Sequence, residues 1–296
     1  MGEQQQSSIN GGDQAALWNG PSGHAWVEEQ AVLDDMLRPL EDLLVEAVGK
    51  TSARHVLDVG CGTGSTTLAL ARRLGAPGQC TGIDISEPML ATARTRAQRD
   101  GSTASFIRAD AQDYAFAPAS FDMIVSRLGV MFFSDPVTAF ANLRQAGTPD
   151  ATLHCIAWRS AADNPFMTTA ERAAAPLLPS VPPRQPGAPG QFAFGDRERV
   201  LSVLQASGWH EIDIQPIDIA CTLPEPALVG YLSRLGPVGL ALRDADAGTR
   251  ARVVEVVRAA FEPYVRGATV RYTASCWIIT ARATAVSQQA RETNHA

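Results

Sequence analysis

The 296-residue sequence lacks the features that mark secreted and membrane proteins. No apolar run is long enough to span a bilayer, and residues 1–14 are polar, without the basic and apolar regions of a signal peptide. The five cysteines show no CxxC spacing, which is typical of a protein kept in a reducing compartment. We therefore predict a cytoplasmic protein that does not cross a membrane.

Basic residues are fewer than acidic ones, 25 Lys and Arg against 31 Asp and Glu. The formal net charge is -6, and no basic cluster is present, so a nucleic-acid partner is disfavoured. No group of His, Cys, Asp and Glu has the spacing of a metal site, which predicts metal-independent chemistry. What remains is the composition of an ordinary globular chain, 45% hydrophobic and 19% charged.

Strand-like and helix-like segments alternate through the middle of the chain. Strands are predicted over residues 54–59, 79–85, 105–108, 121–126 and 151–158. Helices are predicted over residues 65–74, 87–100 and 136–146, with Ser86 as an N-cap and Pro136 in a first turn. This alternation predicts an α/β fold, a parallel sheet with helices wound on both faces.

The flanking segments follow other patterns. We expect residues 1–14 to be disordered and residues 15–49 to form a helical cap, kinked or split at Pro39. Residues 161–195 hold a proline-rich stretch and residues 225–266 are mostly helical, so both are predicted to be insertions that act as lids. A helix over 197–206, strands over 211–223 and 268–281, and a polar tail over 284–296 complete the chain.

A glycine-rich turn, VLDVGCGTG, follows the first predicted strand. Its pattern, G-x-G-x-G, is one residue shorter than the dinucleotide fingerprint, and Asp58 would repel a pyrophosphate. Alternate glycines still let backbone N–H groups approach a ligand closely. A ligand with an amino group, a sulfonium and no phosphate fits better than a dinucleotide. That ligand is S-adenosylmethionine (SAM), and an NAD-dependent oxidoreductase is the disfavoured alternative.

Two further aspartates end predicted strands. Asp84 closes the second strand in TGIDIS, where a carboxylate can accept hydrogen bonds from both ribose hydroxyls, as it also does in NAD enzymes. Asp110 follows the third strand in RADAQD and can accept the adenine amino group. The alternative for both residues is a strand-end Asx turn.

These segments and FDMIVSRLGVMFFSDP together resemble motifs I to IV of the class I SAM-dependent methyltransferases. The pattern is that of the ubiquinone/menaquinone-biosynthesis-like branch (methyltransferase type 11), whose members mostly methylate small molecules. The resemblance implies a seven-stranded Rossmann-like sheet, a methyltransferase domain over residues 50–283, SAM as methyl donor and S-adenosylhomocysteine (SAH) as product.

The resemblance also implies roles in the glycine turn. Gly60 and Gly62 would carry the backbone under the amino-acid end of SAM, with Gly64 completing the turn, and Asp58 would receive the ammonium group. Cys61 would lie beside the cofactor as a small packing residue, not as a nucleophile.

The resemblance implies that residues after the second and third predicted strands contact the adenosine end of SAM. Asp84 would hold the ribose, with Ile85 and Met89 packed on the adenine. Asp110 and Ala111 would meet the amino edge of the base.

The end of the fourth strand and the helical cap complete the implied site. Ser126 and Arg127 would lie where the methyl group meets the substrate, although Arg127 could instead pair with a surface carboxylate. Trp18 and Trp26 would fold over the cofactor pocket; alternatively, they only anchor the helical cap to the rest of the domain by packing. Gln30, one helical turn beyond Trp26, would reach the cofactor.

Candidates for a general base are few. His24 and Arg127 are the predicted catalytic residues, because His24 opens the helix predicted over residues 24–49, near the expected pocket mouth. His154 is expected to be structural and His210 exposed. Three tyrosines without distinguishing features are further candidates: Tyr231, Tyr264 and Tyr272.

The two lid insertions are apolar. Their large apolar residues are Phe166, Met167, Leu177, Leu178, Leu232, Leu235, Val238 and Leu240. Insertions over strand ends shape substrate pockets, so we predict a small, partly hydrophobic acceptor of the aromatic or polyketide type found in secondary metabolism, methylated on O, N or C. Two alternatives stay open: the insertions form a homodimer interface, or the chain binds SAM without catalysis.

Overall fold

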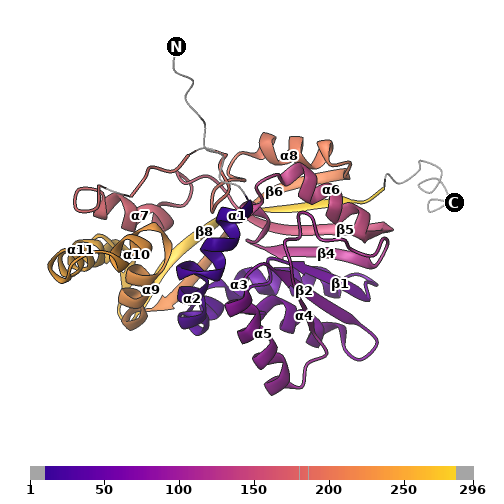
Figure 1. Cartoon of the computed structure of the whole chain (residues 1–296), viewed down its shortest axis with the longest axis horizontal. Coiled ribbons are helices and arrows are strands. Elements are labelled where there is room, and N and C mark those ends of the chain that lie inside the picture. The colour runs from indigo at the N-terminus through magenta and orange to yellow at the C-terminus, as the bar shows by residue number, and fades with distance from the viewer. Residues whose placement is uncertain (1–10, 180, 186, 285–296) are drawn as a thin grey trace, which may run out of the picture.

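The computed structural model describes residues 11–179, 181–185 and 187–284, and a mostly parallel sheet lies at its centre (Figure 1). The strands are β1 (His55–Val59), β2 (Gln79–Asp84), β3 (Ser105–Arg108), β4 (Phe121–Arg127), β5 (Gly147–Trp158), β6 (His210–Pro224), β7 (Val265–Arg266) and β8 (Thr269–Arg282). Seven strands have the order β3-β2-β1-β4-β5-β8-β6, and β7 pairs with β8. Among them β8 is antiparallel to β5 and β6. The Rossmann-like sheet predicted from the sequence is confirmed, with one short strand added.

Helices cover both faces of this sheet (Figure 1). They are α3 (Gln30–Gly49), α4 (Ser65–Leu74) and α5 (Glu87–Asp100) on one face, and α6 (Pro136–Ala146) and α8 (Arg197–Ala206) on the other. Side chains of successive strand residues point to opposite faces. Accordingly, Val56 packs in a cluster with Leu70 of α4, whereas Leu57 packs in a cluster with Phe140 and Leu143 of α6.

Local signals account for the helix boundaries. α4, α5, α6 and α8 begin and end at the predicted residues. Ser86 caps α5 by accepting from the backbone N–H of Met89, and Asp196 caps α8 by accepting from that of Glu198. The strands are less regular, since β5 begins at Gly147 and its pairing with β4 shifts register between Phe121 and Met123.

The N-terminal region corrects two expectations. Residues 11–14, expected to be disordered, lie in α1 (Gly11–Asn19), while residues 1–10 fall outside the described part of the chain. The long helix is interrupted at Glu29, between α2 (Pro21–Glu28) and α3, and not at Pro39. Pro39 removes one N–H donor, and its i−4 partner, Asp35, lies on the exposed side of the helix, where water can satisfy the carbonyl.

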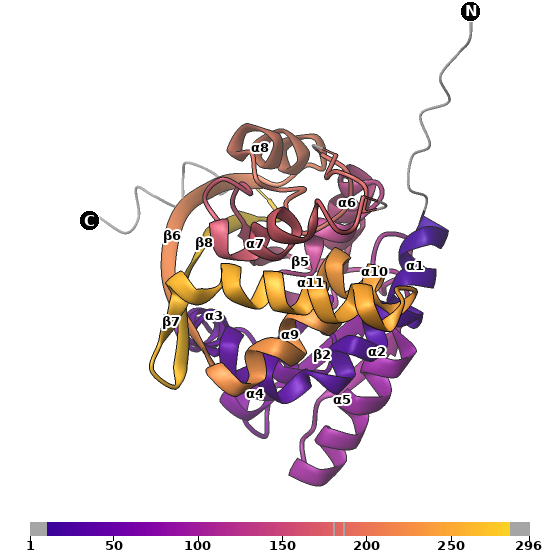
Figure 2. The ribbon, with the colours of Figure 1, turned by 90° about the vertical axis from the view of Figure 1, so that its left-hand side faces the viewer.

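The two insertions meet at one end of the molecule (Figure 2). The first contains α7 (Pro165–Ala174), and the described residues of its proline-rich part, 176–189, form no helix or strand. The second contains η2 (Glu225–Ala227), α9 (Leu228–Arg234), α10 (Gly236–Arg243), α11 (Ala247–Ala260) and η3 (Glu262–Tyr264). Of the helices in the described ranges, none has both the length and the apolar character needed to cross a bilayer.

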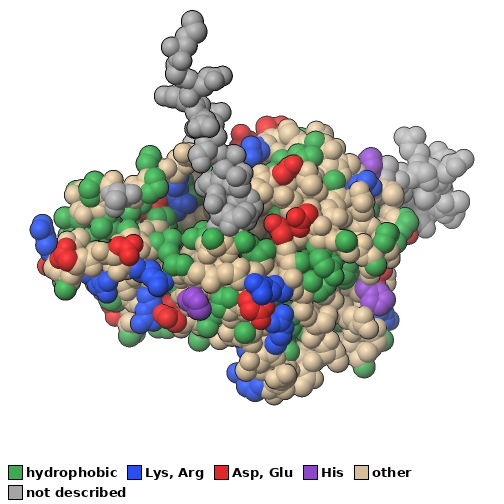
Figure 3. All heavy atoms as spheres, viewed as in Figure 1, with side chains coloured by type: hydrophobic (Ala, Val, Ile, Leu, Met, Phe, Trp, Pro, Cys, Tyr) green, Lys and Arg blue, Asp and Glu red, His purple; other side chains and the backbone are tan. Residues whose placement is uncertain are grey.

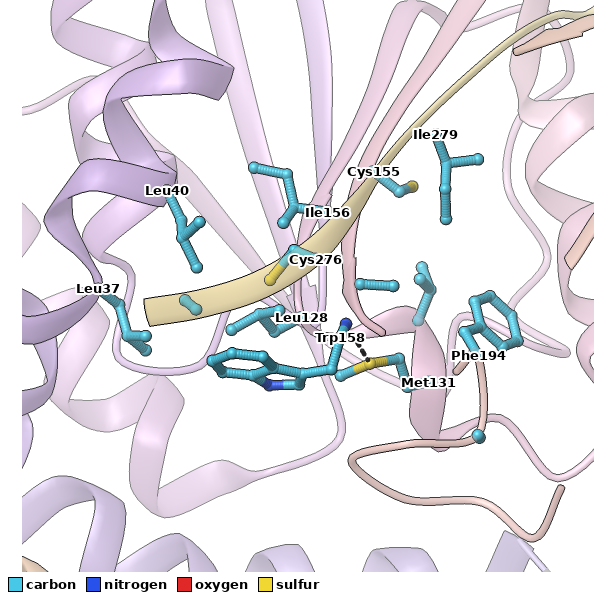
Figure 4. Close-up of a cluster of buried hydrophobic side chains, with 14 of the residues drawn as sticks. Leu37, Leu40, Leu128, Met131, Cys155, Ile156, Trp158, Phe194, Cys276 and Ile279 are labelled. Carbon is cyan, nitrogen blue, oxygen red and sulfur yellow. Dashed lines mark hydrogen bonds between the residues drawn. The ribbon is translucent and has the colours of Figure 1, made fainter. Parts of the chain in front are cut away.

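The core continues from the sheet to the floor of the site described next (Figure 4). Trp158, at the end of β5, donates its backbone N–H to the sulfur of Met131, 3.3 Å away, and both side chains are buried. Met131 belongs to η1 (Val130–Phe132), the turn after β4. Buried packing therefore fixes the segment that follows the fourth strand.

Candidate active site

A cavity of about 430 Å³ opens at the carboxyl ends of the parallel strands. It is lined by the last residues of four strands, Val59, Asp84, Arg127 and Trp158, and by Asp110 beyond β3. Ligands of open α/β sheets bind at this edge, where the strand order reverses between β1 and β4. Helices α1 to α3 and both insertions close the cavity from the other sides.

The glycine turn forms one wall, and its backbone requires glycine. Gly60, Gly62 and Gly64 have φ values of 69°, 55° and 83°, a region that other residues rarely adopt. A Cβ on Gly60 would lie 2.7 Å from the Cα of Gly129, and one on Gly64 would lie 2.8 Å from the Cβ of Ala93. Gly60 and Gly62 line the cavity, whereas Gly64 does not and serves the packing against α5.

Cys61 also lines the cavity, at the turn. Its thiol is buried, and desolvation raises its pKa well above the usual value, so it stays protonated. All five cysteines are buried and unbridged. A packing role fits this environment.

Asp58 does not reach the cavity. The residue is 1% exposed, and its Oδ2 accepts from the Thr67 hydroxyl at 2.7 Å. Burial raises the pKa of this carboxyl to about 7, although Arg127 and the Thr67 hydrogen bond both oppose the shift. The structure therefore does not place Asp58 where it could touch an ammonium group lying on the turn, which corrects the sequence-based expectation.

Asp84 faces the cavity from the end of β2. Its Oδ2 accepts from the N–H of Gly62 at 2.8 Å and its Oδ1 from that of Ser86 at 2.9 Å. Desolvation raises the pKa of Asp84, and these backbone N–H groups oppose the shift. Ile85 and Met89 line the cavity beside it.

Asp110 and Ala111 also line the cavity. Asp110 accepts from the N–H of Gln112 at 2.9 Å, so it does form the Asx turn considered as an alternative. Desolvation is the main cause of its raised pKa. Its carboxylate keeps further acceptor capacity toward the cavity, and the turn and a ligand role are compatible.

The helical cap docks on the second strand end. Asn19 donates to the carbonyl of Ile85 at 3.0 Å and accepts from the N–H of Glu87 at 2.9 Å. The ring of Trp18 meets Trp26 and Phe132 edge to face at 6.0 and 5.1 Å, and all three line the cavity. Asn19 gave no signal in the sequence.

The end of β4 combines a buried hydroxyl with a cavity-facing cation. Ser126 is fully buried, donates to the carbonyl of Val59 at 2.8 Å and accepts from the N–H of Gly129, so it braces the turn and does not line the cavity. Arg127 lines the cavity, and among the described residues its side chain makes one hydrogen bond, to the carbonyl of Leu37 at 3.4 Å. Leu128 follows with a φ of 65°, a strained value for leucine.

Arg127 makes no ion pair within the described ranges. Other arginines near the cavity are paired, such as Arg184 with Glu171 and Arg234 with Glu29. The surface pairing considered for Arg127 is therefore absent. Asp58 feels the charge of Arg127 but forms no ion pair with it, and a cation that lines a largely apolar cavity without an ion pair favours an anionic ligand.

Two predicted residues lie away from the cavity. His24 is exposed on α2 and does not line it. Gln30 begins α3 instead of continuing the helix of Trp26, and it donates to Asp34. The break at Glu29 separates the two residues, and Gln30 contacts the cavity-lining Asp34 without lining the cavity itself.

The remaining base candidates are few. Within the described ranges, no histidine lines the cavity, and His295 lies outside those ranges. Of the tyrosines only Tyr231 lines it, with its pKa raised by burial and its hydroxyl directed at the sulfur of Met167. Tyr272 stacks on Phe166 at 4.0 Å behind the wall.

The lids supply the apolar half of the cavity. Six of the eight predicted lid residues line it: Phe166, Met167, Leu232, Leu235, Val238 and Leu240. Leu177 and Leu178 do not. On the face shown in Figure 3, basic and acidic side chains are interspersed and form no continuous basic surface. Among the described residues no group of three or more His, Cys, Asp or Glu is placed to bind a metal ion.

Comparisons with known proteins point to one chemistry. A family model described as a methyltransferase domain matches residues 56–150. Nocamycin O-methyltransferase of Saccharothrix syringae is 30% identical over 207 residues, which cover 67% of this chain and 74% of that protein. Demethylmenaquinone methyltransferase of Lactiplantibacillus plantarum is 35% identical over 107 residues, 36% of this chain and 45% of that protein.

A solved structure agrees at the level of the fold. A crystal structure described as a putative methyltransferase from Bacillus halodurans superposes with a TM-score of 0.54 at 12% identity, covering 82% of this chain and 98% of that one. At this identity the likeness concerns the sheet and its helices alone.

Proposed function

Because the chain belongs to the class I SAM-dependent methyltransferases, we propose that it methylates an acidic oxygen of a small, amphipathic molecule and releases SAH. The observation that carries the proposal is Arg127, an arginine that lines the cavity without an ion pair to any described residue. An acidic hydroxyl, enol or carboxyl group of the acceptor would supply the missing negative charge.

The cavity residues fit SAM. Gly60 and Gly62 have no side chains, so an amino-acid chain can lie against the backbone of the turn at these two positions. The Asp84 carboxylate uses its two oxygens once each for backbone N–H groups and keeps lone pairs for the ribose hydroxyls. Asp110, with Ala111 beside it, would accept the adenine amino group, and Ile85 and Met89 would cover the base.

Arg127 would act on the acceptor oxygen. A guanidinium in a largely apolar cavity favours the ionised form of a nearby acid and lowers its pKa. No histidine among the described residues lines the cavity, so the acceptor would arrive ionised, or lose its proton to water, under the influence of Arg127. When bound, SAM supplies an electrophilic methyl group on a positively charged sulfur.

The walls would position the acceptor and exclude water. Trp18, Trp26 and Phe132 form an aromatic wall, and the lids add further apolar side chains. In-line transfer needs the oxygen, methyl carbon and sulfur aligned and dry, and a rigid apolar wall meets both needs. The relative named nocamycin O-methyltransferase supports an oxygen acceptor on a small molecule.

The test compares Arg127→Met, Arg127→Lys and a control, Arg72→Met, which removes one exposed arginine of α4. SAH and SAM binding are measured by calorimetry, and methyl transfer is measured on a panel of phenols, enolisable ketones, carboxylic acids and amines. For Arg127→Met we expect nearly unchanged SAH affinity, turnover lowered about a hundredfold, and a pH–rate profile moved to higher pH by about one unit. Arg127→Lys should keep part of the activity because the charge remains.

Three outcomes would contradict the proposal. A parallel loss of SAH affinity in Arg127→Met would mean that Arg127 holds the carboxylate of the cofactor. Methylation of amines alone would exclude an acidic oxygen as acceptor. Absence of SAM and SAH binding in the unsubstituted protein would remove the enzymatic function itself.

A further inference from the structure

Asp34 is a cavity-lining carboxylate that belongs to none of the sequence motifs. It lies in the second turn of α3, with a side chain 14% exposed. Arg96 of α5 pairs with it at 2.7 Å and also donates to the carbonyl of Thr63, in the glycine turn, at 2.8 Å. The ion pair therefore joins Asp34 to the turn on which the amino-acid end of SAM would lie.

The hydrogen bonds of Asp34 leave one oxygen available. Arg96 and Gln30 both donate to Oδ2. Oδ1 accepts from no described residue and keeps its lone pairs. Because two donors fix the carboxylate, a ligand that binds Oδ1 meets an acceptor already held in place, which reduces the entropic cost of binding.

The other carboxylates near the glycine turn are poorly placed for an amino group. Asp58 lies beneath the turn, bonded to Thr67 and away from the cavity. Both oxygens of Asp84 face backbone N–H groups at the end of β2, on the ribose side. Asp34 alone among these three combines exposure to the cavity, attachment to the turn and a free oxygen.

We propose that Asp34 receives the ammonium group of the methionine end of SAM through Oδ1, with Gln30 and Arg96 as positioning residues. The inference rests on the proposed use of SAM in this cavity. The inference assigns this contact to a helix of the N-terminal cap, whereas motif I by itself assigns it to Asp58. Cofactor binding would then require α3 to be docked against the sheet.

Three ligands separate a contact with the amino group from a general effect on the site. SAH carries both the amino and the carboxyl group, decarboxylated SAM carries the amino group without the carboxyl group, and 5′-methylthioadenosine carries neither. Each is titrated by calorimetry into the unsubstituted protein, into Asp34→Asn and into a matched control, Asp35→Asn. Asp35 is the next residue of the same helix and its side chain is 65% exposed, so the control makes the same change of charge outside the cavity.

We expect Asp34→Asn to weaken SAH and decarboxylated SAM by about tenfold to a hundredfold, the loss of one charge-assisted hydrogen bond. Binding of 5′-methylthioadenosine should stay unchanged, and Asp35→Asn should bind all three ligands normally. Asp34→Glu, which keeps the charge and moves it by one methylene, should weaken SAH less than Asp34→Asn and serves if the latter fails to fold.

Other patterns of loss overturn the inference. Equal weakening of 5′-methylthioadenosine would assign Asp34 to the structure of the turn, and unchanged SAH binding would remove the contact. Weakening of SAH without weakening of decarboxylated SAM would shift the effect to the carboxyl group. If the unsubstituted protein bound 5′-methylthioadenosine but not SAH, Asp34 would have no ammonium to receive; if it bound none of the ligands, the proposed function itself would fail.

Discussion

The two ends of the cavity are built by different means. At the glycine turn the wall is backbone, held by positive φ angles and by hydrogen bonds such as those from Gly60 and Cys61 to the carbonyl of Ile83, at 2.9 and 3.2 Å. At the lids the wall is made of side chains from distant segments, with Phe166 packed against Phe261, Tyr264 and Tyr272. A backbone wall tolerates almost no substitution, whereas an apolar side-chain wall can change its residues and keep its volume.

This difference corresponds to what each end would bind. SAM is the same in every member of the family, so the end that would hold it can use fixed backbone geometry. Acceptors differ between enzymes, and side chains on insertions can vary without disturbing the sheet. Two predictions test whether the two ends are separable in this protein, and a third tests the buried carboxyl group beneath the glycine turn.

The largest effect is expected at the cofactor end, from Gly60→Ala. A methyl group there would meet the Cα of Gly129 at 2.7 Å, at a φ of 69°. We expect a loss of about 5 kcal/mol or more of unfolding free energy, or no folded protein, because two backbone segments would have to separate. Denaturant unfolding and SAH titration measure it.

Gly101→Ala is the control for that substitution. Gly101 has a φ of 61°, and no atom lies within 4 Å of the position that a Cβ would take there, so only the backbone preference should count, about 1 kcal/mol. Similar losses for both variants would show that the approach of Gly60 to Gly129 is unimportant.

An intermediate effect is expected at the lid end, from Phe166→Ala. Phe166 is 2% exposed and stacks on Tyr272 at 4.0 Å. Truncation should cost about 3 to 5 kcal/mol of unfolding free energy through the cavity it leaves, and Phe166→Leu should cost less. If the two ends are separable, SAH affinity stays unchanged while the acceptor KM rises. A matching loss of SAH affinity would mean that the lids also hold the cofactor site together.

The smallest of the three effects concerns Asp58 beneath the glycine turn. Its pKa is raised from 3.8 to about 7 by burial, so the native state retains a proton that the unfolded chain releases. This contribution to stability is therefore lost as the pH rises from the ordinary value toward the folded one. Between about pH 5 and pH 8 it amounts to about 2 to 3 kcal/mol.

Asp58→Asn isolates this contribution, because the amide oxygen can still accept from Thr67. We expect the variant to be more stable than the unsubstituted protein at pH 8, with the difference shrinking toward pH 5. Urea unfolding at a series of pH values measures the slope. A difference that does not depend on pH would show that Asp58 is ionised in the native state throughout.

Local chemistry determined most of the secondary structure. Ser86 marks a helix start in the sequence, and α5 begins where it predicts; Asp196 caps α8 in the same way. The break at Glu29 has no such mark, and Pro39, the strongest local signal in that region, does not interrupt its helix. Packing therefore determines where the helix is interrupted, since Leu33, Met36 and Leu40 of α3 are buried against the core.

By itself, the sequence determined the parallel sheet, the glycine turn and the positions of Asp84, Asp110 and Arg127, because each follows from its place at a strand end. It could not show that Asp58 and Ser126 point away from the cavity, since alternation along a strand fixes a face but not what covers it. Only the tertiary structure brought Asp34 and Asn19 of the cap to motifs I and II, and left Arg127 without an ion pair to any residue that the structure describes. Those contacts join residues far apart in the chain, so no local pattern could encode them.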